Sequence, residues 1–167
     1  MRKLVLTTLA AACLTLPLSA QLSAAQDTPA PLDFGPMEKL TIVTEKGPQV
    51  FDIEVADTLA EQARGMMYRD DVPVDTGMLF EFAEPKIATI WMKNTGIPLD
   101  ILFVRSNGTI LKIEHSHKPY TLRTASSEAP VAAVVELAGG RSLELGIQPG
   151  DLVKHEFFGT ENAGNAN

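Results

Sequence analysis

The chain has 167 residues, 45% of them hydrophobic, which is enough for one domain with a substantial core. It carries 14 basic and 21 acidic residues, a formal net charge of −7. Phosphate backbones and anionic lipid surfaces repel such a chain, so we expect no nucleic-acid partner and no binding to anionic membranes.

The first 25 residues have the layout of a secretory signal peptide. Arg2-Lys3 precedes an uncharged apolar run at 4–18, which is shorter than the roughly 20 residues of a membrane-spanning helix. Ser23 and Ala25 fit positions −3 and −1 of a cleavage site, so we expect a cut after Ala25, with a cut after Ala20 as the alternative. We therefore predict a periplasmic or secreted protein that is not inserted in a membrane after cleavage.

Cys13, the only cysteine, lies inside the apolar run. A lipid-anchored cysteine is one interpretation, but the run stays apolar after it, which favours an ordinary residue of a signal peptide. Cleavage would leave a mature chain without cysteine and hence without disulfides. It would also remove two of the 14 basic residues and no acidic one, so the mature charge would be 12 − 21 = −9.

The rest of the chain divides into three parts. Residues 26–37 contain three prolines and are expected to form a flexible leader. Residues 159–167 are small and polar, so we expect a disordered tail. Residues 38–158 are then a single domain, and we expect it to be a monomer.

The first elements of this domain are a hairpin and a helix. Residues 40–44 and 50–55 are predicted strands, and the second alternates between apolar and acidic residues. A helix is predicted at 57–67, where Thr58 and Glu61 have the spacing of a capping box. Gly65 weakens this helix, so the helix either ends there or lies very close to another backbone.

Short strands follow at close spacing, with a turn at 83–86 and a loop at 117–130. Asn107-Gly108 predicts a type I′ hairpin turn, and a short second helix is a candidate at 141–145. The expected strands are 77–82, 87–94, 97–104, 109–116, 131–137 and 152–158. About eight strands without long alternating helices predict a mainly β, compact antiparallel sandwich or barrel.

Several motifs resemble those of domain-of-unknown-function family 192, a bacterial and archaeal family. The most specific is Trp91-Met92-Lys93-Asn94-Thr95 followed by Ile97-Pro98-Leu99-Asp100. Further matches are Arg64-Gly65-Met66-Met67, Gly77-Met78-Leu79-Phe80, Glu136-Leu137-Ala138-Gly139 and Gly150-Asp151-Leu152-Val153. The resemblance implies a compact, mainly β fold and no established activity, so it assigns no catalytic residue.

Strand register brings some polar residues together. A two-residue turn at Asn107-Gly108 would place Leu102 opposite Ile113 and Asp100 opposite His115, on one face. A two-residue turn at Thr95-Gly96 would likewise place Trp91 opposite Asp100. Lys93 would then lie diagonally from Asp100, whereas a three-residue loop would turn Lys93 to the opposite face.

This predicted cluster has two interpretations. Asp100 and His115 could serve as an acid–base pair, with Lys93 as a further candidate for catalysis. Trp91, Lys93 and Asp100 could instead bind a sugar or an aromatic ring. Against both, Asp100 could be a structural carboxylate satisfied by backbone N–H groups, with Trp91 in the core.

Two more charged residues are candidates for ligand binding. Arg64 could hold an anionic group, although pairing with the acidic surface would also explain it. Glu136 lies in an apolar strand, and if it faces inward it needs a cation, for which Arg64 is the expected partner. His115 and His117 have the spacing of two metal ligands on one strand face, but two ligands do not make a site, so we expect no metal and no cofactor.

Three functions remain open. The first is a periplasmic binding or accessory module for a small molecule, a glycan or a protein partner. The alternative is a small periplasmic hydrolase or lyase that uses Asp100 and His115 as its acid–base pair. The third is an interaction factor that acts through an apolar patch or an exposed sheet edge.

Overall fold

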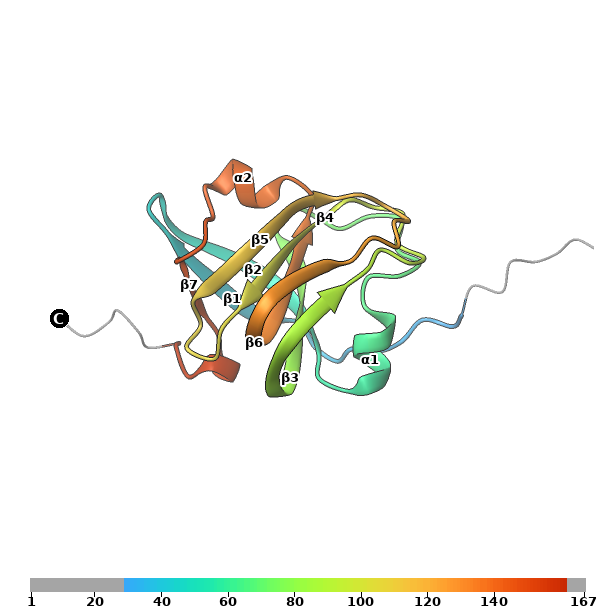
Figure 1. Cartoon of the computed structure of the whole chain (residues 1–167), viewed down its shortest axis with the longest axis horizontal. Coiled ribbons are helices and arrows are strands. Elements are labelled where there is room, and N and C mark those ends of the chain that lie inside the picture. The colour runs from blue at the N-terminus through green and yellow to red at the C-terminus, as the bar shows by residue number, and fades with distance from the viewer. Residues whose placement is uncertain (1–28, 162–167) are drawn as a thin grey trace, which may run out of the picture.

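The computed structural model describes residues 29–161, which form one strongly curled sheet with two short helices (Figure 1). The strands are β1 (Glu38–Thr44), β2 (Gly47–Ala56), β3 (Thr76–Ile90), β4 (Leu99–Val104), β5 (Ile110–His117), β6 (Ala125–Ala138) and β7 (Leu152–Lys154). The helices are α1 (Leu59–Arg64) and α2 (Arg141–Leu145), and a 3₁₀ turn, η1 (Glu156–Phe158), follows β7. The predicted signal peptide and most of the predicted tail lie outside the described residues.

The sheet has seven strands in the order β5-β4-β6-β3-β2-β1-β7. Its two outer strands approach each other, because the Ile110 N–H donates to the Asp151 carbonyl (2.9 Å) and the Val153 N–H donates to the Gly108 carbonyl (2.8 Å). The sheet is therefore a half-barrel whose edges meet near the start of β5. The predicted mainly β fold is confirmed.

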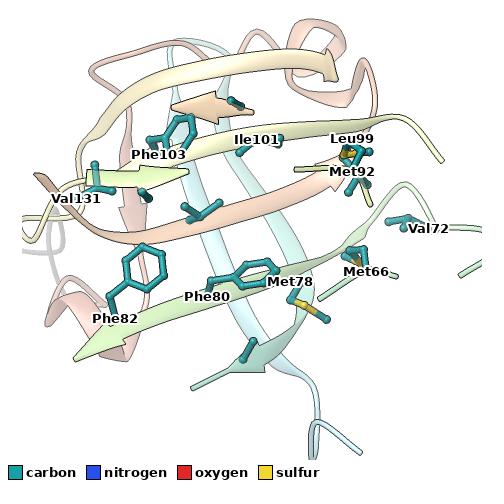
Figure 2. Packing of buried hydrophobic residues seen from close by; sticks show 14 residues of the cluster. Met66, Val72, Met78, Phe80, Phe82, Met92, Leu99, Ile101, Phe103 and Val131 are labelled. Carbon is teal, nitrogen blue, oxygen red and sulfur yellow. The ribbon is translucent and has the colours of Figure 1, made fainter. Parts of the chain in front are cut away.

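The curled sheet buries apolar side chains on both faces. All six residues of β4 are buried, and they alternate between two clusters. Leu102 and Val104 pack in the cluster with Phe51 and Leu79. Leu99, Ile101 and Phe103 belong to the second cluster, which Figure 2 shows together with Phe80, Phe82 and Met92.

Helix α1 has the predicted capping box. The Glu61 N–H donates to Thr58 Oγ1 (3.2 Å), and the Thr58 N–H donates to Glu61 Oε2 (2.9 Å). The helix ends at Arg64, earlier than predicted, because Gly65 has a φ of +46° that helical residues do not adopt. A Cβ at Gly65 would also lie 3.0 Å from the Phe80 ring, so the close neighbour of this glycine is a side chain and not the other backbone that was expected.

The strand pairing corrects three expectations. The turn predicted at 83–86 is a bulge inside the single strand β3, so the sheet has seven strands instead of about eight. The strands predicted at 87–94 and 97–104 do not form a hairpin, because β6 lies between β3 and β4 and pairs with both. The sheet is not wholly antiparallel, since β2 and β3 run parallel and α1 lies in the crossover between them.

The hairpin between β4 and β5 is where the sequence predicted it, but the turn type differs. The Gly108 N–H donates to the Arg105 carbonyl (2.9 Å), and Gly108 has a φ of +79°. The φ of Asn107 is not positive, although a type I′ turn requires it to be. The Asn107 side chain instead accepts a hydrogen bond from the Thr109 N–H (3.1 Å). This is a longer turn closed by a glycine bulge, and the predicted type I′ turn is wrong.

Candidate functional site

A cavity of about 170 Å³ lies where the end of α1 approaches β3 and β6. Three of the residues proposed from the sequence line it: Arg64, Trp91 and Glu136. Most of the other lining side chains are apolar, among them Met66, Phe80 and Leu99. The cavity therefore combines an apolar wall with a few polar groups, as small-molecule sites do.

Glu136 is the most deeply buried ionisable group of this cavity. Its neighbours across the sheet are Ile101 on β4 and Met78 on β3, and its side chain is only 4% exposed. Among the described residues its carboxyl group makes no ion pair and no side-chain hydrogen bond with the protein, but its oxygen atoms are not fully enclosed. Burial raises the pKa of Glu136 to about 8, partly opposed by the positive charge of Arg69, so Glu136 is mainly protonated at neutral pH.

The expected partnership of Glu136 with Arg64 is not formed. Arg64 lines the same cavity, but its guanidinium donates to the Ala30 carbonyl (2.8 Å) and lies 5.4 Å from the centre of the Tyr68 ring. The cation that acts on Glu136 is Arg69, which is itself paired with Glu54 (2.6 Å). The protonated state of Glu136 removes the need for a counter-ion.

Trp91 follows directly after β3 and is 50% exposed. The ammonium group of Lys93 lies 5.3 Å from the centre of its ring. Both side chains also line a shallower hollow beside the cavity, together with Arg64 and Tyr68. Trp91 thus lines both recesses.

Tyr68 and Asn94 hold the loops around Trp91 in place. Both have left-handed backbones, with φ of 64° and 55°, which is costly for residues other than glycine. The Tyr68 N–H donates to the Asn94 carbonyl (2.8 Å), and Asn94 Nδ2 donates to the Tyr68 hydroxyl (2.7 Å). No sequence pattern indicated this pair, because the two residues are 26 positions apart and meet only in the folded chain.

Asp100 lies elsewhere, fully buried among hydrogen-bond donors. Oδ1 accepts from the N–H groups of Ser116 (2.7 Å) and Gly140 (2.9 Å). Oδ2 accepts from the N–H (2.7 Å) and the hydroxyl (2.6 Å) of Ser142. These contacts are those of a structural carboxylate that ties β5 to the start of α2.

His115 reaches Asp100 only through Ser142, whose Oγ lies 2.8 Å from His115 Nδ1. The expected direct pairing is absent, because β5 has a bulge there: Leu99 pairs with His117 and Ile101 with Glu114. His115 is exposed while Asp100 is enclosed. The proposed acid–base pair therefore has no accessible carboxylate.

The predicted cluster of Trp91, Lys93 and Asp100 does not form. Trp91 and Lys93 lie in the connection between β3 and β4, which passes over the cavity. Asp100 follows Leu99 on β4, and successive side chains of a strand point to opposite faces, so Leu99 reaches the cavity and Asp100 does not.

Residues 29–161 contain neither a metal-binding cluster nor a membrane-spanning helix. No group of three or more His, Cys, Asp and Glu side chains in this range is placed to hold a metal ion. His117 Nε2 bonds to the Arg123 carbonyl (3.0 Å), and its neighbour Glu114 pairs with the Arg123 guanidinium (2.8 Å). No helix in the same range combines the length and apolar character needed to cross a bilayer.

Residues 41–155 match the model of domain-of-unknown-function family 192, described as "Uncharacterized ACR". This range covers more than half of the chain and nearly all of the sheet. No curated protein matches the chain.

Two crystal structures are similar to the chain. One is a protein of unknown function from Novosphingobium aromaticivorans DSM 12444, with 36% identity, a TM-score of 0.71, and coverage of 87% of this chain and 94% of the other. The other is described as a "putative transcription regulator" from Sinorhizobium meliloti 1021, with 37% identity, a TM-score of 0.70, and coverage of 72% of this chain and 95% of the other.

Proposed function

The chain belongs to domain-of-unknown-function family 192, and on that premise we propose that it is an exported binding module whose ligand enters the cavity of Glu136 and Trp91. The amino-terminal sequence supports export, because a basic pair, an apolar run and a small-residue cleavage site follow one another there.

The observation that carries the binding role is the state of Glu136. Burying a carboxyl group without a protein partner costs free energy, and groups with strongly shifted pKa values cluster at sites where a ligand or a reaction uses them. Glu136 opens into a cavity, and its protonated form can donate a hydrogen bond to an oxygen atom of a ligand.

The size and walls of the cavity define the group that it accepts. Its volume of about 170 Å³ is close to that of an engineered cavity of roughly 150 Å³ that takes up benzene. Trp91 supplies a flat wall at the entrance, and Met66 and Phe80 supply apolar surface. The ligand therefore inserts one ring-sized group that carries an oxygen atom toward Glu136.

Trp91 provides the test, because it is the only tryptophan of the chain. Its fluorescence would be recorded while monosaccharides, uronic acids and aromatic carboxylates are titrated into the protein. We expect a saturable change in emission with at least one of these compounds. If none of them changes the emission, the cavity does not bind free single-ring compounds, and the binding role would then require a larger ligand that carries such a group.

Variants of Glu136 connect binding to the cavity. Glu136→Gln keeps a hydrogen-bond donor and should retain binding, whereas Glu136→Leu should weaken it about tenfold or more. Glu45→Leu, at an exposed turn position, is the matched control and should bind as the original protein does. Equal affinity of the Glu136→Leu variant would contradict a role for this carboxyl group.

A further inference from the structure

The second half of β3 has an unpaired edge. β2 pairs with β3 only from Thr76 to Phe80, and beyond Phe80 the described strands pair with β3 on its β6 side alone. The Ala88 N–H donates to Ser127 Oγ of β6 (2.9 Å). Successive peptide groups of a strand point to opposite edges, so those of Ile87 and Thr89 face the unpaired edge.

A hollow of about 410 Å³ lies along this edge, between α1 and β3. It shares Gln62, Phe80 and Thr89 with the Glu136 cavity, so the two recesses adjoin, and we call them together the groove. Where the groove begins, Gln62 Nε2 donates to the Glu81 carbonyl (2.6 Å). Beyond Glu81, no described strand pairs with this edge of β3, so its backbone groups can bond to another molecule. In Figure 1, α1 lies beside this half of β3.

The charged side chains along the groove have one sign. Lys86 lies over the Phe82 ring (3.9 Å) at one end and Arg64 lies at the other, with Lys93 in the hollow beside it. Glu136, the only acidic residue in the lining among residues 29–161, is mainly protonated at neutral pH. The chain as a whole has a net charge of −7, so this groove is a local positive region that favours an anionic occupant.

We propose that the ligand is an extended acidic peptide that adds as a strand to the free edge of β3 at Ile87 and Thr89. One of its side chains enters the Glu136 cavity, and its acidic side chains face Lys86 and Arg64. This inference rests on the proposed binding function and names the class of its ligand. A peptide fits because it alone carries the alternating N–H and C=O groups that an edge strand bonds.

Strand addition is tested by methylating the backbone of the peptide. Labelled peptides of about ten residues, with Glu or Asp alternating with Val, Leu, Phe or Tyr, would be screened against the purified protein by fluorescence anisotropy. The best binder would then be made in two forms, each N-methylated at every second residue. Only one form blocks the N–H groups that face β3, so we expect one form to lose about tenfold or more in affinity and the other to bind normally.

Matched variants of the protein give an independent measurement. Thr89→Pro removes an N–H group from the free edge and should weaken peptide binding, whereas Thr89→Val keeps the backbone and should bind normally. Lys86→Glu should weaken binding of the acidic peptide and reduce its dependence on salt. Circular dichroism would check that each variant is folded, and the methylated peptides decide the question if Thr89→Pro does not fold.

Two outcomes would overturn the inference. Equal affinity of the two methylated forms would exclude pairing with the edge of β3. If no peptide binds while single-ring compounds still change the Trp91 emission, the cavity is a small-molecule site and only the peptide inference is wrong. If neither binds, the proposed function is wrong as well.

Discussion

Glu136 is a residue whose surroundings change greatly when this chain folds. In the unfolded chain water surrounds its carboxyl group, and in the folded sheet it lies between apolar residues of β3 and β4. Desolvation raises the pKa of Glu136 more than the positive charge of Arg69 lowers it, so the carboxyl group keeps its proton at neutral pH. The side chain becomes a hydrogen-bond donor that the amino-acid type alone does not imply.

The shifted pKa makes stability depend on pH with a defined sign. The pKa of Glu136 is raised from 4.5 to about 8, so between these values the folded protein holds a proton that the unfolded chain has lost. The free energy of unfolding contributed by Glu136 therefore falls as the pH rises, by about 1.4 kcal/mol per pH unit. Glu136→Gln should remove this decrease and should be more stable than the original protein near pH 8.

Urea unfolding at about pH 5, pH 6.5 and pH 8 would measure this difference. Glu81, whose pKa burial and neighbouring carboxylates raise to about 7, contributes a slope of the same sign. Because Glu81 is present in both proteins, the difference between them isolates Glu136. The exposed Glu45→Gln variant should follow the original protein, and a parallel curve for Glu136→Gln would disprove the assignment.

At the scale of elements, Asp100 connects parts that the sheet alone would leave loose. It binds the bulge of β5 through Ser116, the turn before α2 through Gly140, and the start of α2 through Ser142. Helix α2 has only five residues and no side-chain cap at its N-cap residue, so it depends on such tertiary bonds. Asp100 is therefore a connector of elements.

Asp100→Asn should destabilise the protein and leave the ligand cavity working. The new amide N–H group would face the N–H and hydroxyl of Ser142, so buried donors would lose their acceptor, at a cost of roughly 3 kcal/mol. Thermal or urea unfolding would measure the loss, with the exposed Asp33→Asn variant as the control. Ligand binding, measured by Trp91 emission, should persist in the folded variant. Loss of binding without loss of stability would show that Asp100 takes part in ligand binding.

At the scale of the whole molecule, the shape of the sheet creates the site. β3 is 15 residues long, and it pairs with β2 only along its first part before the bulge between Glu81 and Lys86. Beyond the bulge β3 no longer pairs with β2, and the groove separates β3 from α1. The free edge, the cavity and the cations of the groove all follow from this divergence.

The proposed export is a prediction about the whole chain. Expressed with its own amino terminus in a bacterial host, the protein should be recovered from the periplasm or medium, and mass spectrometry should find a chain that begins at Gln26. Cleavage after Ala25 removes residue 13, so Cys13→Ser should change neither the location nor the mass of the mature chain. Lipid attached to the mature chain, or retention of the intact amino terminus, would contradict this prediction.

The sequence alone determined the local features. The capping box of α1, the short helix α2, the β4–β5 hairpin and the mainly β fold follow from patterns among residues close in the chain. The candidates Arg64, Trp91 and Glu136 were identified from their residue types, and the fold brings these three to one cavity.

Only the tertiary structure decided which polar residues meet. β6 enters the sheet between β3 and β4 from about 40 residues further along the chain, so no local turn could reveal that Trp91 and Asp100 are separated. One extra residue in the β5 bulge moved His115 away from Asp100, because strand side chains alternate and a single insertion changes their face. The state of Glu136 depends on burial, which comes from segments distant in sequence that close around it.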